Sequence, residues 1–204
     1  MLVVGSNLIN FPVLSLHVGG RIAFTDSPVI DPEDLSVIAY ELDGAATKDP
    51  ENGNILMIRD VREFSEDGLI IDSADRLVNR EDVVRLDKTM DLGFKLIGLK
   101  VVTKDGKKLG KVIDYTIDSG TFSIYQLIVQ RPFFEAFVDP ELTINRSQIT
   151  EIDDDKITVK HSKQQIKLPK KNSKQDFVPN YVNPFRKPNY SEEKKSKSSS
   201  KTSE

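Results

Sequence analysis

Residues 96–129 decide the fold of this chain, and they read LIGLKVVTKDGKKLGKVIDYTIDSGTFSIYQLIV. Three runs rich in β-branched residues are separated by an Asp-Gly dipeptide at 105–106 and a Ser-Gly dipeptide at 119–120. Such runs are typical of an antiparallel β-meander, because glycine supplies the positive φ that tight turns need. Gly98 and Gly110 lie inside the strand patterns, where glycine usually marks a bulge or a barrel corner. We therefore expect three antiparallel strands here.

The turns and glycines belong to a longer pattern. Its members are Gly98, Val101, Asp105, Gly106, Lys108, Gly110, Lys111, Val112, Asp114, Ile124 and Leu127 to Val129. This pattern resembles the signature of the PRC-barrel family. The resemblance implies a small β-barrel, as in the cytoplasmic domain of the photosynthetic reaction centre H subunit and the C-terminal barrel of a ribosome maturation factor. It implies little about function, since one fold hosts many functions.

Residues 8–42 look like a divergent copy of the same stretch. At a shift of 87 residues the copy places Ile30 on Ile117, Asp31 on Asp118, Val37 on Ile124, Tyr40 on Leu127 and Leu42 on Val129. Further along, the shift becomes 88 residues, and Val61 meets Ile149 while Ile71 meets Val159. A nearly constant shift over about 60 residues indicates a tandem repeat of one supersecondary unit.

We therefore predict a mainly β chain with two small antiparallel PRC-type β-barrels in tandem. The expected domains are a divergent PRC-like barrel over 1–71, a helical connector over 72–92, a PRC-barrel over 93–168 and a disordered basic tail over 169–204. In the connector, an aspartate or serine at 72–73 can cap a helix and an apolar stripe follows. One helix and two short helices, the second opening at 81–82, are both compatible with this pattern.

Composition restricts the class of protein. The chain has 204 residues and no cysteine, so it has no disulfide framework and no thiolate site. No apolar run approaches the roughly 20 residues that a membrane-spanning helix needs, and the start lacks the pattern of a signal peptide. A cytoplasmic location is the expectation. Residues 160–204 carry 12 Lys and Arg against 4 Asp and Glu, whereas the remainder is acidic.

The sequence offers little for catalysis. Its two histidines are His17 and His161, and no Ser-His-Asp arrangement, HExxH motif or phosphate-binding loop is present. The run of three aspartates at 153–155 lacks the spacing of a calcium loop and is better explained as a polar turn. Asp31 and Asp118 fit Asx-type turns. We expect a non-enzymatic protein with no catalytic residue, cofactor or metal site.

A loop in the second copy differs from its counterpart in the first. It contains Arg131, Phe133, Phe134 and Phe137, where the first copy has only small and polar residues. Three phenylalanines in one loop either plug the barrel mouth, cover the first barrel, or form an apolar docking surface for a partner protein.

The tail contains one segment, 177–190, with four aromatic residues and three prolines. Its candidate binding residues are Phe177, Tyr181, Phe185, Arg186 and Tyr190. The segment could fold back onto an acidic barrel, bind a partner protein as an extended peptide, or bind single-stranded RNA by stacking and charge.

The predicted function is that of a non-enzymatic adaptor or scaffold whose barrels bind a protein partner. The resemblance to the ribosome maturation factor implies ribosome assembly or RNA processing as its setting. In that case the basic tail would supply a second contact to RNA or the ribosome. The alternative is a membrane-surface scaffold in envelope, division or electron-transport machinery, recruited to anionic lipid by the tail. The sequence makes no prediction of the oligomeric state.

Overall fold

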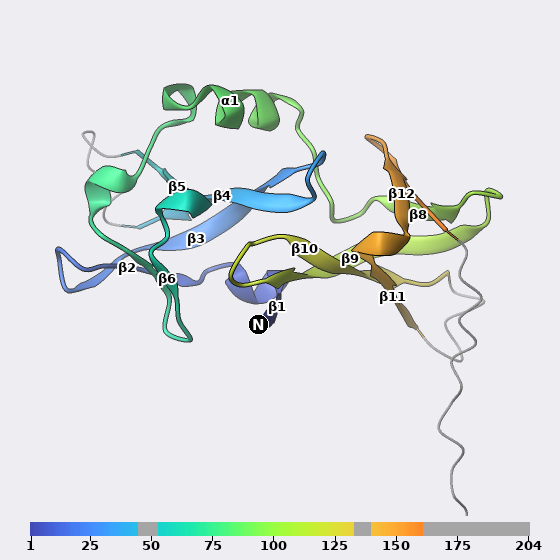
Figure 1. Cartoon of the computed structure of the whole chain (residues 1–204), viewed down its shortest axis with the longest axis horizontal. Helices are drawn as coiled ribbons and strands as arrows, with labels where there is room; N and C mark the ends of the chain where they lie inside the picture. Colours follow the sequence, from blue (N-terminus) through green and yellow to red (C-terminus); the bar gives the residue numbers. More distant parts are fainter. Residues whose placement is uncertain (45–52, 133–139, 161–204) are drawn as a thin grey trace, which may run out of the picture. The chain divides into compact units, whose positions relative to one another are not determined.

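The structure is a computed structural model, which describes residues 1–44, 53–132 and 140–160 (Figure 1). The described residues are mainly β, with strands in two sheets and one α-helix, α1 (Val84–Asp91). None of the helices in these ranges has the length and apolar character needed to cross a membrane.

The first sheet follows the order β5-β4-β3-β2-β7-β6. Its strands are β2 (Pro12–Ser15), β3 (Gly20–Asp31), β4 (Ser36–Asp43), β5 (Ile55–Met57), β6 (Glu63–Phe64) and β7 (Leu69–Ile71). Neighbouring strands are antiparallel except β2 and β7, which are parallel. The parallel pair brings the start and the end of this segment together.

The second sheet follows the order β11-β10-β9-β8-β13-β12. Its strands are β8 (Lys100–Thr103), β9 (Lys108–Asp118), β10 (Ile124–Gln130), β11 (Glu141–Asn145), β12 (Ile149–Ile152) and β13 (Lys156–Val159). The strands β8, β9 and β10 form the predicted antiparallel meander, and the register shifts beside Gly110, where a bulge was expected. A short strand from the start of the chain, β1 (Leu2–Val4), also pairs with β9.

The two sheets share their strand order and also their register. The antiparallel pairs that correspond at a shift of 87 residues are Pro28–Tyr40 with Tyr115–Leu127, and Val29–Ala39 with Thr116–Gln126. The parallel pairs that correspond at a shift of 88 are Val13–Leu69 with Val101–Ile157, and Leu14–Ile70 with Val102–Thr158. The backbone thus follows the same one-residue change of shift that the sequence predicted.

Buried side chains from both sheets form one continuous apolar core. The alternation of side chains along each strand places every second residue in it. Its members include Val13, Tyr40, Leu69, Val101, Leu127 and Ile157.

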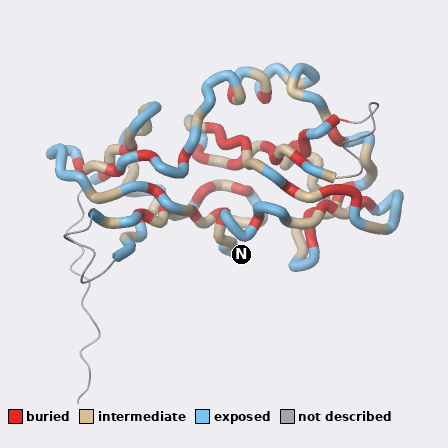
Figure 2. The backbone as a smooth tube through the Cα atoms, turned by 180° about the vertical axis from the view of Figure 1, so that it is seen from behind, coloured by how far each residue is buried: buried red, intermediate tan, exposed pale blue. Residues whose placement is uncertain are grey.

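The opposite face of the first sheet is covered by α1, which crosses β3 and β4 (Figure 1). Leu86 of the helix packs there on Val29, Ala39, Ile55 and Met57. Figure 2 shows buried residues in the strands beneath the helix and, along the helix itself, exposed residues that alternate with buried ones.

The corresponding face of the second sheet is polar. The residues at the equivalent positions are Thr116, Gln126, Thr143 and Asn145, and the Gln126 Nε2 donates a hydrogen bond to the Asn145 Oδ1 at 2.8 Å. Polar side chains leave this face little apolar surface to bury, so a covering helix would bring little stabilisation here.

The predicted helical connector is helical only in part. Residues 74–76 and 80–82 form single 3-10 turns, and the α-helix begins at Val84. The prediction of a helix before this point is wrong because Val78 forms a β-bridge with Ile55. Pairing with the edge of the first sheet holds the backbone extended at that residue. The predicted apolar stripe is also broken, since Val84 is exposed.

Candidate functional site

Two equivalent turns lie where the sheets meet, and an aspartate organises each. After β3, the Asp31 Oδ1 accepts a hydrogen bond from the backbone N–H of Glu33 at 2.9 Å. After β9, the Asp118 Oδ1 accepts hydrogen bonds from the backbone N–H groups of Gly120 and Thr121, at 3.0 and 3.1 Å. The Asx-type turns predicted at both aspartates are confirmed.

The two turns are joined by a pair of reciprocal backbone hydrogen bonds. The Val37 N–H donates to the Phe122 carbonyl at 3.0 Å, and the Ile124 N–H donates to the Leu35 carbonyl at 2.8 Å. Each bond becomes the other under the shift of 87 residues. Reciprocal contacts of this kind are the signature of a local two-fold relation, as in an isologous dimer interface.

Side chains strengthen the same junction. Leu35 and Phe122 both adopt positive φ, 43° and 54°, and both are buried. A positive φ is costly for a bulky residue, so packing must compensate for it. The ring of Phe122 lies edge-on to that of Phe64 in the first sheet, with centroids 6.3 Å apart. The junction is therefore a well-packed contact between the two sheets.

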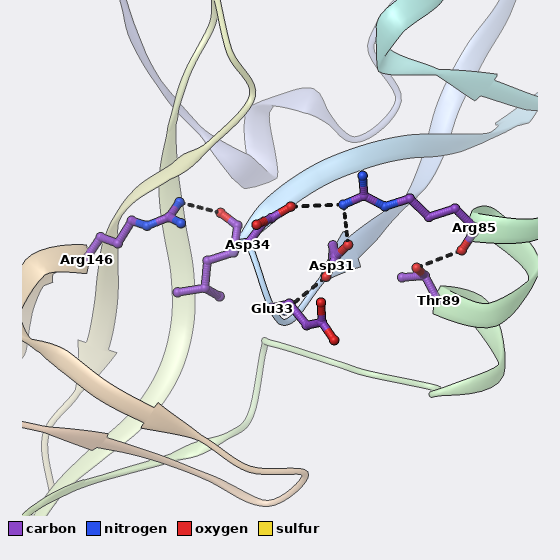
Figure 3. Close-up of polar contacts among 7 residues, drawn as sticks. Asp31, Glu33, Asp34, Arg85, Thr89 and Arg146 are labelled. Atoms are coloured by element: carbon purple, nitrogen blue, oxygen red, sulfur yellow. Dashed lines mark hydrogen bonds and ion pairs between the residues drawn. The ribbon is translucent and has the colours of Figure 1, made fainter.

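Two arginines hold the first turn from opposite sides (Figure 3). From α1, the Arg85 Nη2 donates to the Asp31 Oδ2 at 2.7 Å and to the Asp34 Oδ2 at 2.9 Å. From the 3-10 turn Arg146–Gln148 of the second sheet, the Arg146 Nη1 donates to the Leu35 carbonyl at 3.3 Å. The turn thus connects the helix, the first sheet and the second sheet.

The ion pair between Arg85 and Asp31 is asymmetric in exposure. The Asp31 side chain is 8% exposed, whereas that of Arg85 is 63% exposed. Burial alone would raise the pKa of Asp31. The hydrogen bonds from Arg85 and from the backbone of Glu33 outweigh burial, and the pKa lies below its ordinary value. The carboxylate is therefore charged and held in place at neutral pH.

A cavity of about 370 Å³ opens beside this junction. Its apolar lining comes from β3, from the end of α1 and from the connection to β8, and includes Pro28, Val29, Ile30, Met90, Phe94 and Leu96. At its polar side the Ser27 Oγ donates a hydrogen bond to the Glu41 Oε2 at 2.5 Å. A volume of this size lies in the range of about 300–1,000 Å³ that bound ligands occupy.

A row of three lysines crosses the outer face of the second sheet. Lys156 on β13 pairs with Lys100 on β8, which in turn pairs with Lys111 on β9. Their neighbours Val101, Val112 and Ile157 are buried, so alternation directs the lysines outward. We call these three residues the lysine row. In the first sheet the equivalent positions are Gly68, Pro12 and Phe24.

The lysine row is only partly neutralised. The Lys156 Nζ lies 3.3 Å from the Asp153 Oδ2, whereas Lys100 and Lys111 have no ion pair with any residue that the structure describes. Like charges directly opposite each other destabilise a sheet. The sequence analysis missed this row, since only the register of three strands brings the lysines together. The Lys-rich hairpin over 104–111 was the available signal.

The predicted binding residues lie mostly outside the described ranges. Arg131 follows β10 directly, and its backbone N–H donates to the Pro140 carbonyl at 2.9 Å. Its neighbour Gln130 pairs with Lys111, so Arg131 begins a loop beside the lysine row. The other candidates lie outside the described residues: Phe133, Phe134, Phe137, Phe177, Tyr181, Phe185, Arg186 and Tyr190. Within residues 1–44, 53–132 and 140–160, no group of three His, Asp or Glu side chains could hold a metal ion.

Comparison with known protein families places a PRC-barrel domain at residues 88–166. The match covers the end of α1 and all of β8 to β13, and it confirms the PRC-barrel domain expected in this part of the chain. No curated protein matches the chain.

Proposed function

We propose that this chain is a non-enzymatic adaptor made of two PRC-type units in tandem, and that it binds an acidic protein partner through the lysine row. In this proposal residues 1–71 are a divergent PRC-type unit, 72–92 connect it to the PRC-barrel domain, and 169–204 form a basic tail. Ribosome assembly and RNA processing are the proposed setting, by analogy with the ribosome maturation factor.

The tandem arrangement is supported by the backbone rather than by the family match, which covers 88–166 alone. Both sheets have the same strand order, the same parallel pair and the same bulge positions. The reciprocal hydrogen bonds of the junction would make the pair a rigid platform.

The lysine row is the observation that carries the proposal. Three like charges in directly paired positions cost up to about 1 kcal/mol per pair in an isolated sheet. An acidic partner surface would convert this repulsion into attraction and would speed association. Because α1 lies on the first sheet, no helix among the described residues covers the outer face of the second sheet, where such a partner would bind.

The chemistry of the row favours a protein over a nucleic acid. The paired positions continue from Lys111 to Gln130 and end at Glu141, and Asp153 lies beside Lys156. These carboxylates would repel the phosphodiester backbone of a nucleic acid, whereas a protein surface can present both signs of charge.

The test compares two double variants with the same change in charge. Lys100→Glu with Lys111→Glu reverses the row, and Arg59→Glu with Lys88→Glu reverses two exposed cations elsewhere. The full chain is used to capture a partner from nuclease-treated lysate, and the affinity is then measured with the purified partner. We expect the row variant to bind about tenfold or more weakly, as for loss of charge pairs at an interface, and the control to bind as the unaltered chain does.

Equal binding by both variants would refute the role of the row. Capture from untreated lysate that is absent from the nuclease-treated lysate would point to RNA instead.

Membrane-surface scaffolding is the second candidate, because a lysine near an anionic surface contributes on the order of 1 kcal/mol and residues 160–204 are strongly basic. Sedimentation with phosphatidylserine vesicles at low and moderate salt tests it. Binding that depends on the tail and is lost with salt would support this alternative over the adaptor.

A further inference from the structure

The correspondence between the two halves begins before the first strand of each sheet. The residues that match at a shift of 88 are Gly5 with Gly93, Leu8 with Leu96 and Asn10 with Gly98. Both leucines are fully buried, at 0% and 1% exposure, and the residues at 10 and 98 both have positive φ. The segments that precede them, 2–4 and 90–92, are therefore equivalent positions.

These equivalent segments have different structures. Residues 2–4 form β1, which adds to the edge of β9 and pairs Leu2 with Asp118 and Val4 with Thr116. Residues 90–92 are the end of α1 and its C-cap, in helical conformation. The matching edge of the first sheet is Val29–Asp31 on β3, and on that side the described residues contain no strand that pairs with it.

The cavity of about 370 Å³ lies along this unpaired edge. Its lining includes Pro28, Val29 and Ile30 of β3 together with Met90 and Gly93.

The glycines that follow the two segments, Gly5 and Gly93, differ in how closely other atoms approach them. A Cβ built on Gly5 would lie 2.5 Å from the ring of Tyr115, whereas a Cβ built on Gly93 would meet no atom within 4 Å. Gly5, at the start of η1 (Gly5–Leu8), is thus closely packed against the second sheet, whereas its counterpart Gly93 has free space around its Cβ position.

We propose that the edge Val29–Asp31 is an acceptor site for an extended, apolar segment of a partner protein, which adds to the first sheet as β1 adds to the second. Backbone hydrogen bonds along β3 would supply the affinity, through its carbonyl groups and the N–H of Ile30, since Pro28 and Pro32 have no N–H to donate. The apolar lining would select β-branched side chains, the mode of β-augmentation. Strand β1 indicates the chemistry of the occupant, because its residues Leu2, Val3 and Val4 occupy the equivalent edge of the second sheet.

Residues 90–92, the equivalent segment of the second half, are poorly placed to fill this site. Residues 90–92 could reach it as a strand only if α1 unwound at its end. Unwinding would remove Met90 from the cluster around Leu86, which is fully buried against β3, β4 and β5. Burial of that apolar face keeps the helix in place, so residues 90–92 leave the site to an external segment.

The test uses a fluorescent peptide with the sequence of residues 2–6, Leu-Val-Val-Gly-Ser, acetylated and amidated, as the probe for the full chain. A control peptide carries proline at both valine positions, which removes the N–H groups that a ladder needs. We expect anisotropy to show saturable binding of the first peptide and binding of the proline peptide that is weaker by about tenfold or more.

Two variants locate the binding. Ser27→Trp places an indole at the cavity lining, and Asp26→Trp places the same ring on the exposed neighbouring residue. We expect the first to weaken binding by about tenfold or more and the second to leave it unchanged. Hydrogen exchange on the unaltered chain provides a measurement without substitution: the peptide is expected to slow exchange at Val29–Asp31 and not at Thr116–Asp118.

Absence of saturable binding would overturn the proposal, as would equal binding of the proline peptide. Protection at Thr116–Asp118 instead would mean that the peptide displaces β1 from the second sheet, and this result would also overturn it. None of these outcomes bears on the lysine row, which lies on the second sheet and is tested separately.

Discussion

Tyr40 provides the sharpest test of the core, because its substitution by phenylalanine should stabilise the protein. The side chain is 0% exposed, and its hydroxyl has no hydrogen-bond partner among the described residues. A buried polar group without a partner costs roughly 1–3 kcal/mol. Tyr40→Phe keeps the ring and removes the hydroxyl, so we expect the free energy of unfolding to rise by about 1 kcal/mol at pH 7.

The same substitution should change the response to alkali. Burial raises the pKa of Tyr40 far above its ordinary value of 10.0, and the neighbouring Tyr115 raises it further. The folded state therefore keeps its proton where the unfolded state loses it. This difference in protonation leaves the free energy of unfolding unchanged below pH 10 and lowers it as the pH rises above 10. The advantage of Tyr40→Phe should then widen by about 1.4 kcal/mol per pH unit above pH 10.

Urea unfolding followed by circular dichroism at pH 7 and above pH 10 measures both effects. Tyr125→Phe is the matched control, because Tyr125 is 51% exposed. We expect no more than a small change from the control at pH 7. A loss of about 1 kcal/mol or more in Tyr40→Phe would refute the reasoning and would indicate a bound water or another partner at the hydroxyl.

Two further substitutions test the junction turn and the meander. Asp31→Asn keeps the oxygen of the Asx turn but loses the ion pair with α1, and should cost about 1–2 kcal/mol at pH 7, a value reduced by the exposure of the partner cation. Since the pKa values of Asp31 and Asp118 are both lowered, this penalty is present above about pH 4 and should shrink as the pH falls below it. Asp118→Asn, at the exposed twin turn, should cost much less; equal costs in urea unfolding would contradict the role of burial. Gly110→Ala should cost several kcal/mol, on the order of 2–4, because its φ is +149° and a Cβ would overlap the Gln130 carbonyl oxygen. Gly20→Ala, which meets no atom within 4 Å, should be close to neutral in thermal unfolding, and a similar loss in both would refute the steric argument.

The sequence was informative wherever the cause of a structure is local. The meander β8–β9–β10 follows from alternating β-branched runs and from glycine at the turns. Asp31 and Asp118 form their turns by hydrogen bonds to residues two or three positions away, which a sequence pattern can predict. The shift between the two halves was also readable, because equivalent strands bury equivalent side chains.

Several features depended on contacts between residues far apart in the chain. The helical pattern over 72–83 did not give an α-helix, because Val78 forms a bridge with Ile55 and pairing with a sheet edge outweighs weak helix propensity. The aromatic residues at 133–137 and 177–190 lie outside the described residues, and their predicted roles stay predictions.

The amino-acid sequence by itself determined the strands, their turns and the shift that relates the two halves, because each of these is encoded by neighbours within a few residues or by repetition of a pattern. Only the tertiary structure decided which surfaces are left for function. The lysine row exists because the register of β13, β8 and β9 aligns residues 156, 100 and 111, and the unpaired edge of β3 exists because α1 ends in helical conformation where its counterpart is a strand. Both depend on long-range pairing, in which a shift of one residue would turn every side chain to the other face.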